Sequence, residues 1–185
     1  SVEDKETIYL ISINSNNENE WAKEDSIDQW TAEFTSKHLI AINKNKGQFV
    51  FNQPLDFTQS KVQELFVDNN NVYFKSYDDD SLRINAYNKT NGKKIWTSTF
   101  ERPDLNLYDL KSVFYKDKIF LPLNNMIVYL NKKDGKILGK YDADQEIEQI
   151  SSFNTYGLYN NNLSFIIENI DYELLTINLD DVTLI

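Results

Sequence analysis

INAYNKTNGKKIW, residues Ile84–Trp96, is the stretch of the sequence that decides the fold. Apolar and polar residues alternate up to Asn88, Gly92 follows four residues later, and a second short run ends at Trp96. Asn closes turns through its own side chain, and Gly supplies the positive φ at which a second strand begins. A loop of this length with a late Gly is a common hairpin connection, so the stretch predicts strand, turn and strand.

The same pattern recurs three more times along the chain, in Leu39–Phe51, Val128–Gly139 and Leu174–Ile185. The equivalents of Asn88 are Asn43, Asn131 and Asn178, and the equivalents of Gly92 are Gly47 and Gly135. The Asn residues are spaced by 45, 43 and 47 residues, which indicates an internal repeat. Val182 stands where the fourth Gly would be. Because Val does not take a positive φ cheaply, we expect the last hairpin to turn differently or to fray.

Two further strand-like runs precede each hairpin, so that each repeat predicts four antiparallel strands. They are Thr7–Ile13 and Gln29–Ser36, Val62–Val67 and Val72–Ser76, Leu110–Tyr115 and Lys118–Leu123, and Ile147–Phe153 and Leu163–Glu168. In the first repeat, the polar insertion Asn14–Asp28 separates the two runs. Four such strands in series compose a propeller blade. We therefore predict an all-β protein, a small β-propeller of four four-stranded antiparallel blades. The alternative is an open arc of blades that closes by dimerisation.

The predicted blades divide the chain at about 6–55, 56–104, 105–143 and 144–185, within one domain. The segment Ile84–Trp96 resembles the PQQ-like β-propeller repeat, whose blades end in strand, turn, Gly, strand and often Trp. Trp96 stands where the family's inter-blade docking tryptophan lies, whereas Phe51 and Gly139 take that position in two other repeats. The resemblance implies a propeller architecture and little chemistry.

Charge and composition limit the classes of binding partner that we expect for this chain. The formal net charge is −10, which disfavours nucleic acid and suits a basic protein partner. There is no cysteine, which excludes disulfides and thiolate chemistry, and no apolar run reaches the length of a membrane span. We expect a cytoplasmic protein, monomeric or homodimeric. The alternative is a location in the periplasm or cell envelope if a signal sequence was removed.

Few residues suggest catalysis. The single histidine, His38, has no evident nucleophile or orienting partner in the sequence. The acidic clusters Asp78–Asp80 and Asp142–Glu146 lack the Gly of a calcium loop, so we expect solvated turns. The PQQ-like family includes quinoprotein dehydrogenases, and these enzymes use paired cysteines and a calcium site. Without cysteine, we expect no enzyme, cofactor or metal. A carboxylate pair for glycoside hydrolysis stays open, because its separation is a three-dimensional quantity.

The first-repeat insertion is the candidate partner-binding segment. It places Trp21 and Trp30 in and beside a set of carboxylates, namely Glu18, Glu20, Glu24, Asp25 and Asp28. Exposed tryptophan is enriched at binding hot spots, although both side chains could instead pack on the sheet edge. We interpret the chain as a non-enzymatic protein-binding propeller, most specifically an immunity or inhibitor protein that neutralises a basic toxin domain. The alternatives are a cell-envelope assembly scaffold of the same repeat type and a carbohydrate-binding propeller.

Overall fold

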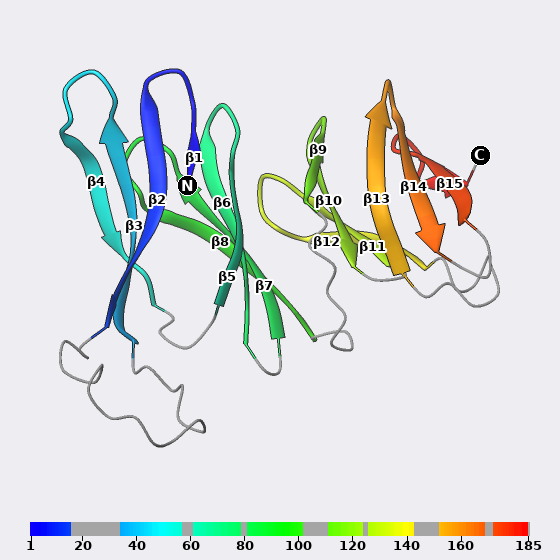
Figure 1. Ribbon diagram of the computed structural model, residues 1–185, viewed down its shortest axis with the longest axis horizontal. Helices are drawn as coiled ribbons and strands as arrows, with labels where there is room; N and C mark the ends of the chain where they lie inside the picture. Colours follow the sequence, from blue (N-terminus) through cyan, green and yellow to red (C-terminus); the bar gives the residue numbers. More distant parts are fainter. Residues whose placement is uncertain are drawn as a thin grey trace. The chain divides into compact units, whose positions relative to one another are not determined.

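The computed structural model describes residues 1–15, 34–56, 61–78, 81–101, 111–123, 126–142, 152–168 and 172–184. All regular structure within these ranges is β-strand, arranged as four sheets of four strands (Figure 1). The sheets are antiparallel and their strands follow chain order, which confirms the predicted all-β class and the four-stranded blades. We call the sheets blades 1 to 4.

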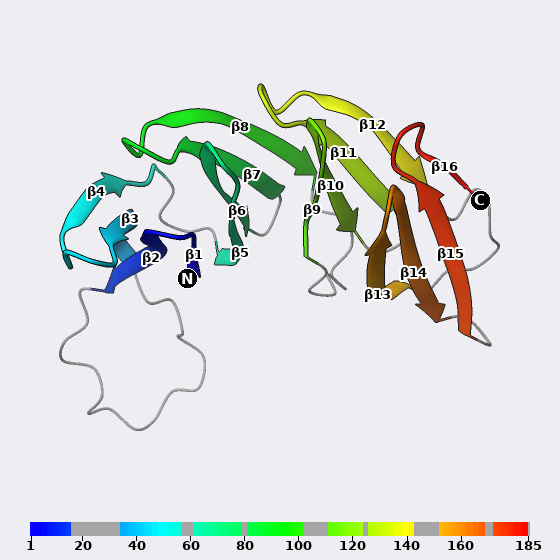
Figure 2. The same cartoon turned by 90° about the horizontal axis from the view of Figure 1, so that it is seen from above.

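The chain divides into two compact units, Ser1–Phe100 and Glu101–Ile185. Unit 1 contains blade 1 and blade 2, except that the last residue of β8 lies past the boundary. Blade 1 consists of β1 (Val2–Glu3), β2 (Thr7–Ser15), β3 (Phe34–Asn43) and β4 (Phe49–Pro54). Blade 2 consists of β5 (Lys61–Val67), β6 (Asn71–Tyr77), β7 (Ser81–Asn88) and β8 (Lys94–Glu101). Figure 2 shows the fan of strands from β5 to β8 from above.

Unit 2 contains the other two blades. Blade 3 consists of β9 (Val113–Tyr115), β10 (Lys118–Leu123), β11 (Met126–Asn131) and β12 (Ile137–Asp142). Blade 4 consists of β13 (Ser152–Tyr159), β14 (Asn162–Glu168), β15 (Tyr172–Asn178) and β16 (Thr183–Leu184).

Blade 1 differs from its prediction in its first strands. Its first strand is Val2–Glu3, which is too short to show alternation, so Thr7–Ser15 is the second strand and the insertion follows it. The end of the predicted strand Gln29–Ser36 belongs to β3, which runs unbroken from Phe34 to Asn43. In blade 4, the first strand is Ser152–Tyr159 and not Ile147–Phe153.

One apolar core lies between the two blades of each unit. In unit 1, Tyr9, Leu39 and Ala41 of blade 1 pack with Val72, Phe74 and Tyr87 of blade 2. In unit 2, Phe120, Ile127 and Tyr141 of blade 3 pack with Leu163, Phe165, Leu175 and Ile177 of blade 4. Alternate residues of a strand point to one face, so each run of alternating apolar side chains places one row in the core.

The Asn–Gly hairpins share one set of hydrogen bonds. The amides of Gly47, Gly92 and Gly135 donate to the carbonyl oxygens of Asn43, Asn88 and Asn131, each at 2.9 Å. The three glycines have φ of 63°, 69° and 71°, and the side-chain oxygen of each Asn accepts an amide two residues later. The turn is therefore closed from both ends, by a side chain and by a left-handed residue.

The expectation for the fourth hairpin was wrong. Val182 adopts φ 58°, as the glycines do, and Asn178 Oδ1 accepts the amide of Asp180 in the same way. Val182 also packs against the apolar core of unit 2. Burial of its side chain offsets the cost of the left-handed backbone, which is about 1–2 kcal/mol.

Candidate docking and interaction surfaces

One residue from each strand of a blade lies side by side in a row across the sheet, and we call this set the docking row. The register of blade 1 places Val2 opposite Tyr9, Tyr9 opposite Ala41, and Ala41 opposite Phe51. Directly opposed residues share one face, so the row faces the core of unit 1.

The docking row of blade 1 contacts the hairpin of blade 2. Because Ala41 is small, the rings of Tyr9 and Phe51 approach across it to a centroid distance of 6.4 Å. The ring of Phe51 covers Gly92, where a Cβ atom would lie only 2.6 Å from Phe51 Cδ2. Two features therefore require a glycine at position 92: its positive φ and the close approach of the Phe51 ring.

Blade 2 has a row of the same kind. Phe66 lies opposite Tyr73 and stacks on it at 5.4 Å, and Tyr73 lies opposite Ala86. Trp96, on β8, reaches Tyr73 at 5.9 Å and is 8% exposed. A small residue on the third strand again lets two aromatic rings meet.

Blade 3 reverses the last two positions of the row. Its row is Val113, Phe120, Tyr129 and Gly139, in register. Tyr129 stacks on Phe120 at 5.6 Å and covers Gly139, where a Cβ atom would lie 2.4 Å from Tyr129 Oη. The aromatic side chain has moved from the fourth strand to the third, and the small residue has moved the other way. Sequence reasoning recorded Gly139 as a departure from the pattern and missed Tyr129, because the exchange is visible only in the strand register.

Blade 4 has a polar row. Gly157 lies opposite Ser164, and Ser164 lies opposite Thr176. The two hydroxyl groups form a hydrogen bond of 2.9 Å. The described residues of the docking row in blade 4 therefore include no aromatic side chain.

An ion pair joins the two blades of unit 1. Lys89 Nζ, in the blade 2 hairpin, lies 2.6 Å from Asp4 Oδ2, in the first turn of blade 1. Asp4 Oδ1 also accepts the amides of Glu6 and Thr7. Burial by itself would raise the pKa of Asp4, but the Lys89 ammonium group and the two amides outweigh it and lower this pKa to about 2.

His38 and Asp78, which the sequence analysis considered for catalysis and calcium binding, lie within the described residues. His38 Nδ1 lies 2.7 Å from Asn52 Oδ1. Asp78 closes the turn before Ser81 by accepting its amide and hydroxyl, and it also pairs with Arg83. Asp79, Asp80 and residues 143–146 lie outside the described residues. Within the described ranges, no group of three or more His, Cys, Asp or Glu side chains could hold a metal ion.

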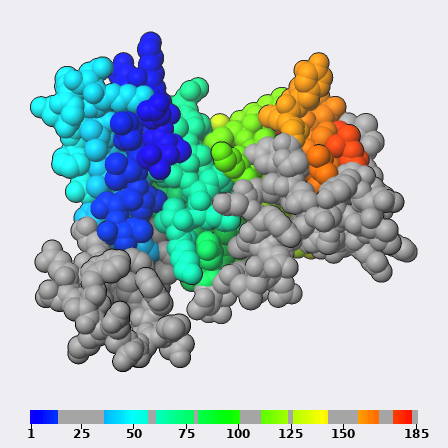
Figure 3. Space-filling model, viewed as in Figure 1, coloured from blue at the N-terminus to red at the C-terminus, as the bar shows by residue number. Residues whose placement is uncertain are grey.

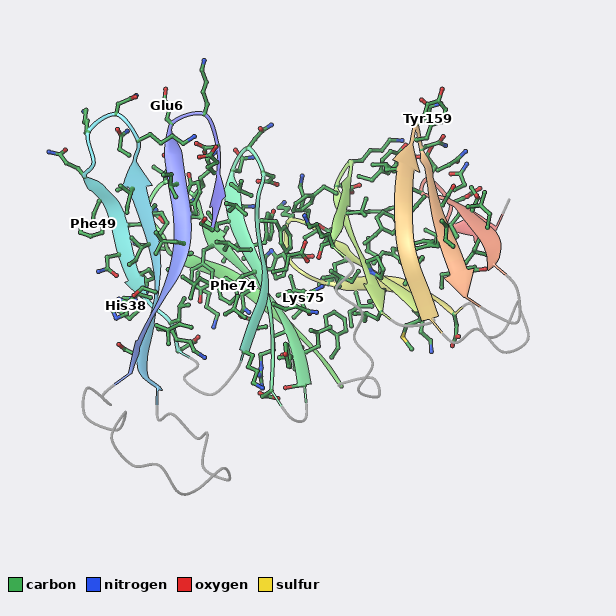
Figure 4. The ribbon with its side chains drawn as sticks, in the orientation of Figure 1. Glu6, His38, Phe49, Phe74, Lys75 and Tyr159 are labelled. Carbon is green, nitrogen blue, oxygen red and sulfur yellow. The ribbon has the colours of Figure 1, made fainter. Side chains whose placement is uncertain are left out.

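Blade 2 also buries one ion pair. Lys75 Nζ lies 3.4 Å from Glu64 Oε2, and the two side chains are 4% and 12% exposed. Such a pair is costly to desolvate and favours one register of the two strands that carry it. We assign it a structural role between β5 and β6 (Lys75 is labelled in Figure 4).

The predicted partner-binding residues Glu18, Glu20, Trp21, Glu24, Asp25, Asp28 and Trp30 all lie outside the described residues. The structure fixes where their segment is attached, since β2 ends at Ser15 and β3 begins at Phe34.

The described part of the chain contains no helix long and apolar enough to cross a membrane.

Repeated four-stranded sheets with docking rows define this chain as an array of β-propeller blades. A family model described as outer membrane protein assembly factor BamB matches residues 28–155, which is more than half of the sequence. The chain therefore belongs to this family of PQQ-like repeats, as its resemblance implied. No curated protein matches the sequence.

Solved structures share the fold at low identity. BamB from Moraxella catarrhalis is 11% identical with a TM-score of 0.53, and the match covers 82% of this chain and 45% of that one. A quinohemoprotein alcohol dehydrogenase from Comamonas testosteroni is 8% identical with a TM-score of 0.54, over 81% and 32%. The computationally designed protein Ika8 is 15% identical with a TM-score of 0.50, over 74% and 39%. The chain thus spans less than half the length of each of these proteins.

Proposed function

We propose that this chain is a non-enzymatic, protein-binding propeller segment that serves as an assembly scaffold in the cell envelope. The observation that carries the proposal is the family match over residues 28–155, whose description names an outer membrane protein assembly factor. The same description favours the envelope over the cytoplasm as the location. The immunity-protein and carbohydrate-binding interpretations draw no support from the comparisons.

The physical basis of the proposed function is a rigid frame that carries a charged segment. Docking rows and buried cores hold the blades of each unit, and β2 and β3 bracket residues 16–33. This segment has six carboxylates and one lysine, so it contributes half of the net charge of −10. A segment of this composition speeds the encounter with a basic protein surface, and a tryptophan such as Trp21 supplies an anchor.

Crosslinking in cells that produce the full-length gene product, followed by mass spectrometry, would identify the partner. Binding kinetics with the purified partner would then locate the site. Reversing Glu18, Glu20 and Glu24 to Lys should slow association at least severalfold and flatten its salt dependence, whereas Trp21→Ala should mainly speed dissociation.

The matched control reverses three exposed carboxylates elsewhere, Glu6, Asp117 and Asp134, which changes the net charge by the same amount. It should slow association less than the segment variant does. An unchanged affinity after deletion of residues 16–23 would place the site elsewhere. Failure to crosslink any protein would count against the binding function itself.

A further inference from the structure

The hairpin of blade 2 contains the one Asn–Gly pair of the sequence, Asn91–Gly92. In such a pair, the amide nitrogen of the glycine attacks the side-chain amide of the asparagine, because glycine has no side chain to hinder the approach. A bond forms between Gly92 N and Asn91 Cγ, and the bond from Cγ to Nδ2 breaks. Nδ2 takes up the proton of the Gly92 amide and leaves as ammonia. Water then opens the succinimide ring, which leaves aspartate or isoaspartate at position 91.

The folded hairpin engages both reacting groups in hydrogen bonds. Gly92 N donates to Asn88 O at 2.9 Å. This bond must break before the attack, since the attacking nitrogen loses its proton. Asn91 Oδ1 accepts the amide of Lys93 at 3.0 Å, which holds the Asn91 side chain in one orientation. Asn91 is nevertheless exposed, so the water that completes the reaction has access to it.

Blade 1 adds a second restraint on the same glycine. The Phe51 ring covers Gly92, as described above, and limits its movement. Phe51 stands on β4, which pairs only with β3 among the described strands and is cyan in Figure 3. An edge strand opens locally at a lower cost than a strand paired on both sides. The rate at which Asn91 reacts should therefore depend on how often the contact between blades 1 and 2 opens.

We propose that Asn91 is a deamidation site that the docking of blade 1 on blade 2 protects, so that its modification records the opening of this junction. The proposal rests on the hairpin and on Phe51, both of which belong to unit 1. It is independent of the function proposed above, because the reaction requires only water.

The two products should have different consequences for the fold. Aspartate already occupies the equivalent position in blade 3, where Asp134 Oδ1 accepts a backbone amide at 3.1 Å. Aspartate at position 91 should therefore preserve the hairpin. Isoaspartate adds a carbon atom to the backbone between Asn88 and Gly92. It should therefore break the hydrogen bond between these two residues and move Gly92 away from the Phe51 ring.

Peptide mapping by mass spectrometry of the full chain tests the protection. Incubated in one buffer at one pH, the denatured chain should deamidate at Asn91 at least about tenfold faster than the folded chain. Phe51→Ala should raise the rate of the folded chain severalfold. The control Val50→Ala, at a neighbouring side chain that is 43% exposed, should leave the rate unchanged. Phe51→Leu replaces Phe51→Ala if circular dichroism shows that the latter does not fold.

Three results would overturn the proposal. Equal rates in the folded and denatured chains would show that the hairpin gives no protection. A rate that no folded Phe51 variant changes would show that the docking of blade 1 has no part in it. The third concerns the products: Asn91→Asp should keep the Tm of the wild type, whereas the isoaspartate form, separated by chromatography, should melt several degrees lower. An isoaspartate form as stable as Asn91→Asp would contradict the required position of Gly92.

Discussion

The two units build the same blade with different chemistry. In unit 1, an aspartate closes the turn before the second strand: Asp4 and Asp68 each accept two backbone amides and the hydroxyl of Tyr9 or Tyr73. In unit 2, the equivalent turns contain Lys116 and Asn160 at φ of 53° and 54°. The turns of unit 1 thus use a carboxylate that accepts the backbone amides, whereas the turns of unit 2 use a residue in the left-handed conformation.

The docking rows differ in the same manner. Unit 1 places a small residue on the third strand and an aromatic residue on the fourth, whereas blade 3 of unit 2 exchanges them as Tyr129 and Gly139. In blades 1 and 3, one large ring therefore lies opposite one small residue, and the ring can stand on either of the last two strands.

Removing the aromatic residue from the fourth strand of blade 2 should have the largest effect. Trp96→Ala should lower the free energy of unfolding by about 3–5 kcal/mol, the usual range for a buried aromatic residue. Chemical denaturation followed by fluorescence measures it. The neighbouring Ile95→Ala, at a side chain 44% exposed, should cost much less. Equal losses in the two variants would mean that Trp96 has no special role in unit 1.

Two hairpin glycines of unit 1 should respond unequally to the same substitution. Gly92→Ala combines a left-handed backbone with a clash against Phe51 and should cost about 2–4 kcal/mol. Gly47→Ala meets no atom within 4 Å, so only the backbone term of about 1–2 kcal/mol remains. Thermal unfolding of both variants gives the comparison. If the two costs are the same, Phe51 does not dock on the next hairpin.

The ion pair of unit 1 should contribute a pH-dependent stability. At neutral pH, Asp4→Asn should cost about 1–2 kcal/mol, because the charged acceptor of two amides and of Lys89 is lost. The folded-state pKa of about 2 lies below the usual 3.8, so this stability is fully present above about pH 4 and is lost as the pH falls towards 2. The difference between variant and wild type should shrink over that window.

The corresponding pair in unit 2 is the control for this measurement. Lys116 and Asp180 are 62% and 46% exposed at a distance of 2.5 Å, so solvent screens their interaction. The hydrogen bond from Lys116 also lowers the pKa of Asp180, but Asp180→Asn should change the Tm less than Asp4→Asn does, with a smaller dependence on pH. A pH dependence of equal size in both variants would remove this distinction between the units.

The sequence predicted those parts of the fold that depend on local chemistry. The Asn–Gly spacing indicated the hairpins, because a turn needs a side-chain cap and a left-handed residue at fixed separation. The exchange of Tyr129 and Gly139 was not predictable, since it depends on which residues face each other across β11 and β12. The left-handed Val182 depends on core contacts from other strands. The candidate partner-binding segment still rests on its composition.

The most direct test of the docking row is a double-mutant cycle at Tyr129 and Gly139. Tyr129→Ala removes the ring, Gly139→Trp introduces a second ring into occupied space, and the double variant recreates the arrangement of blade 2. Each single substitution should cost about 2–4 kcal/mol. The double variant should recover more than half of the summed loss, which is a strong departure from additivity. A double variant whose loss equals the sum of the two single losses would contradict the conclusion that one ring at either position joins the blades.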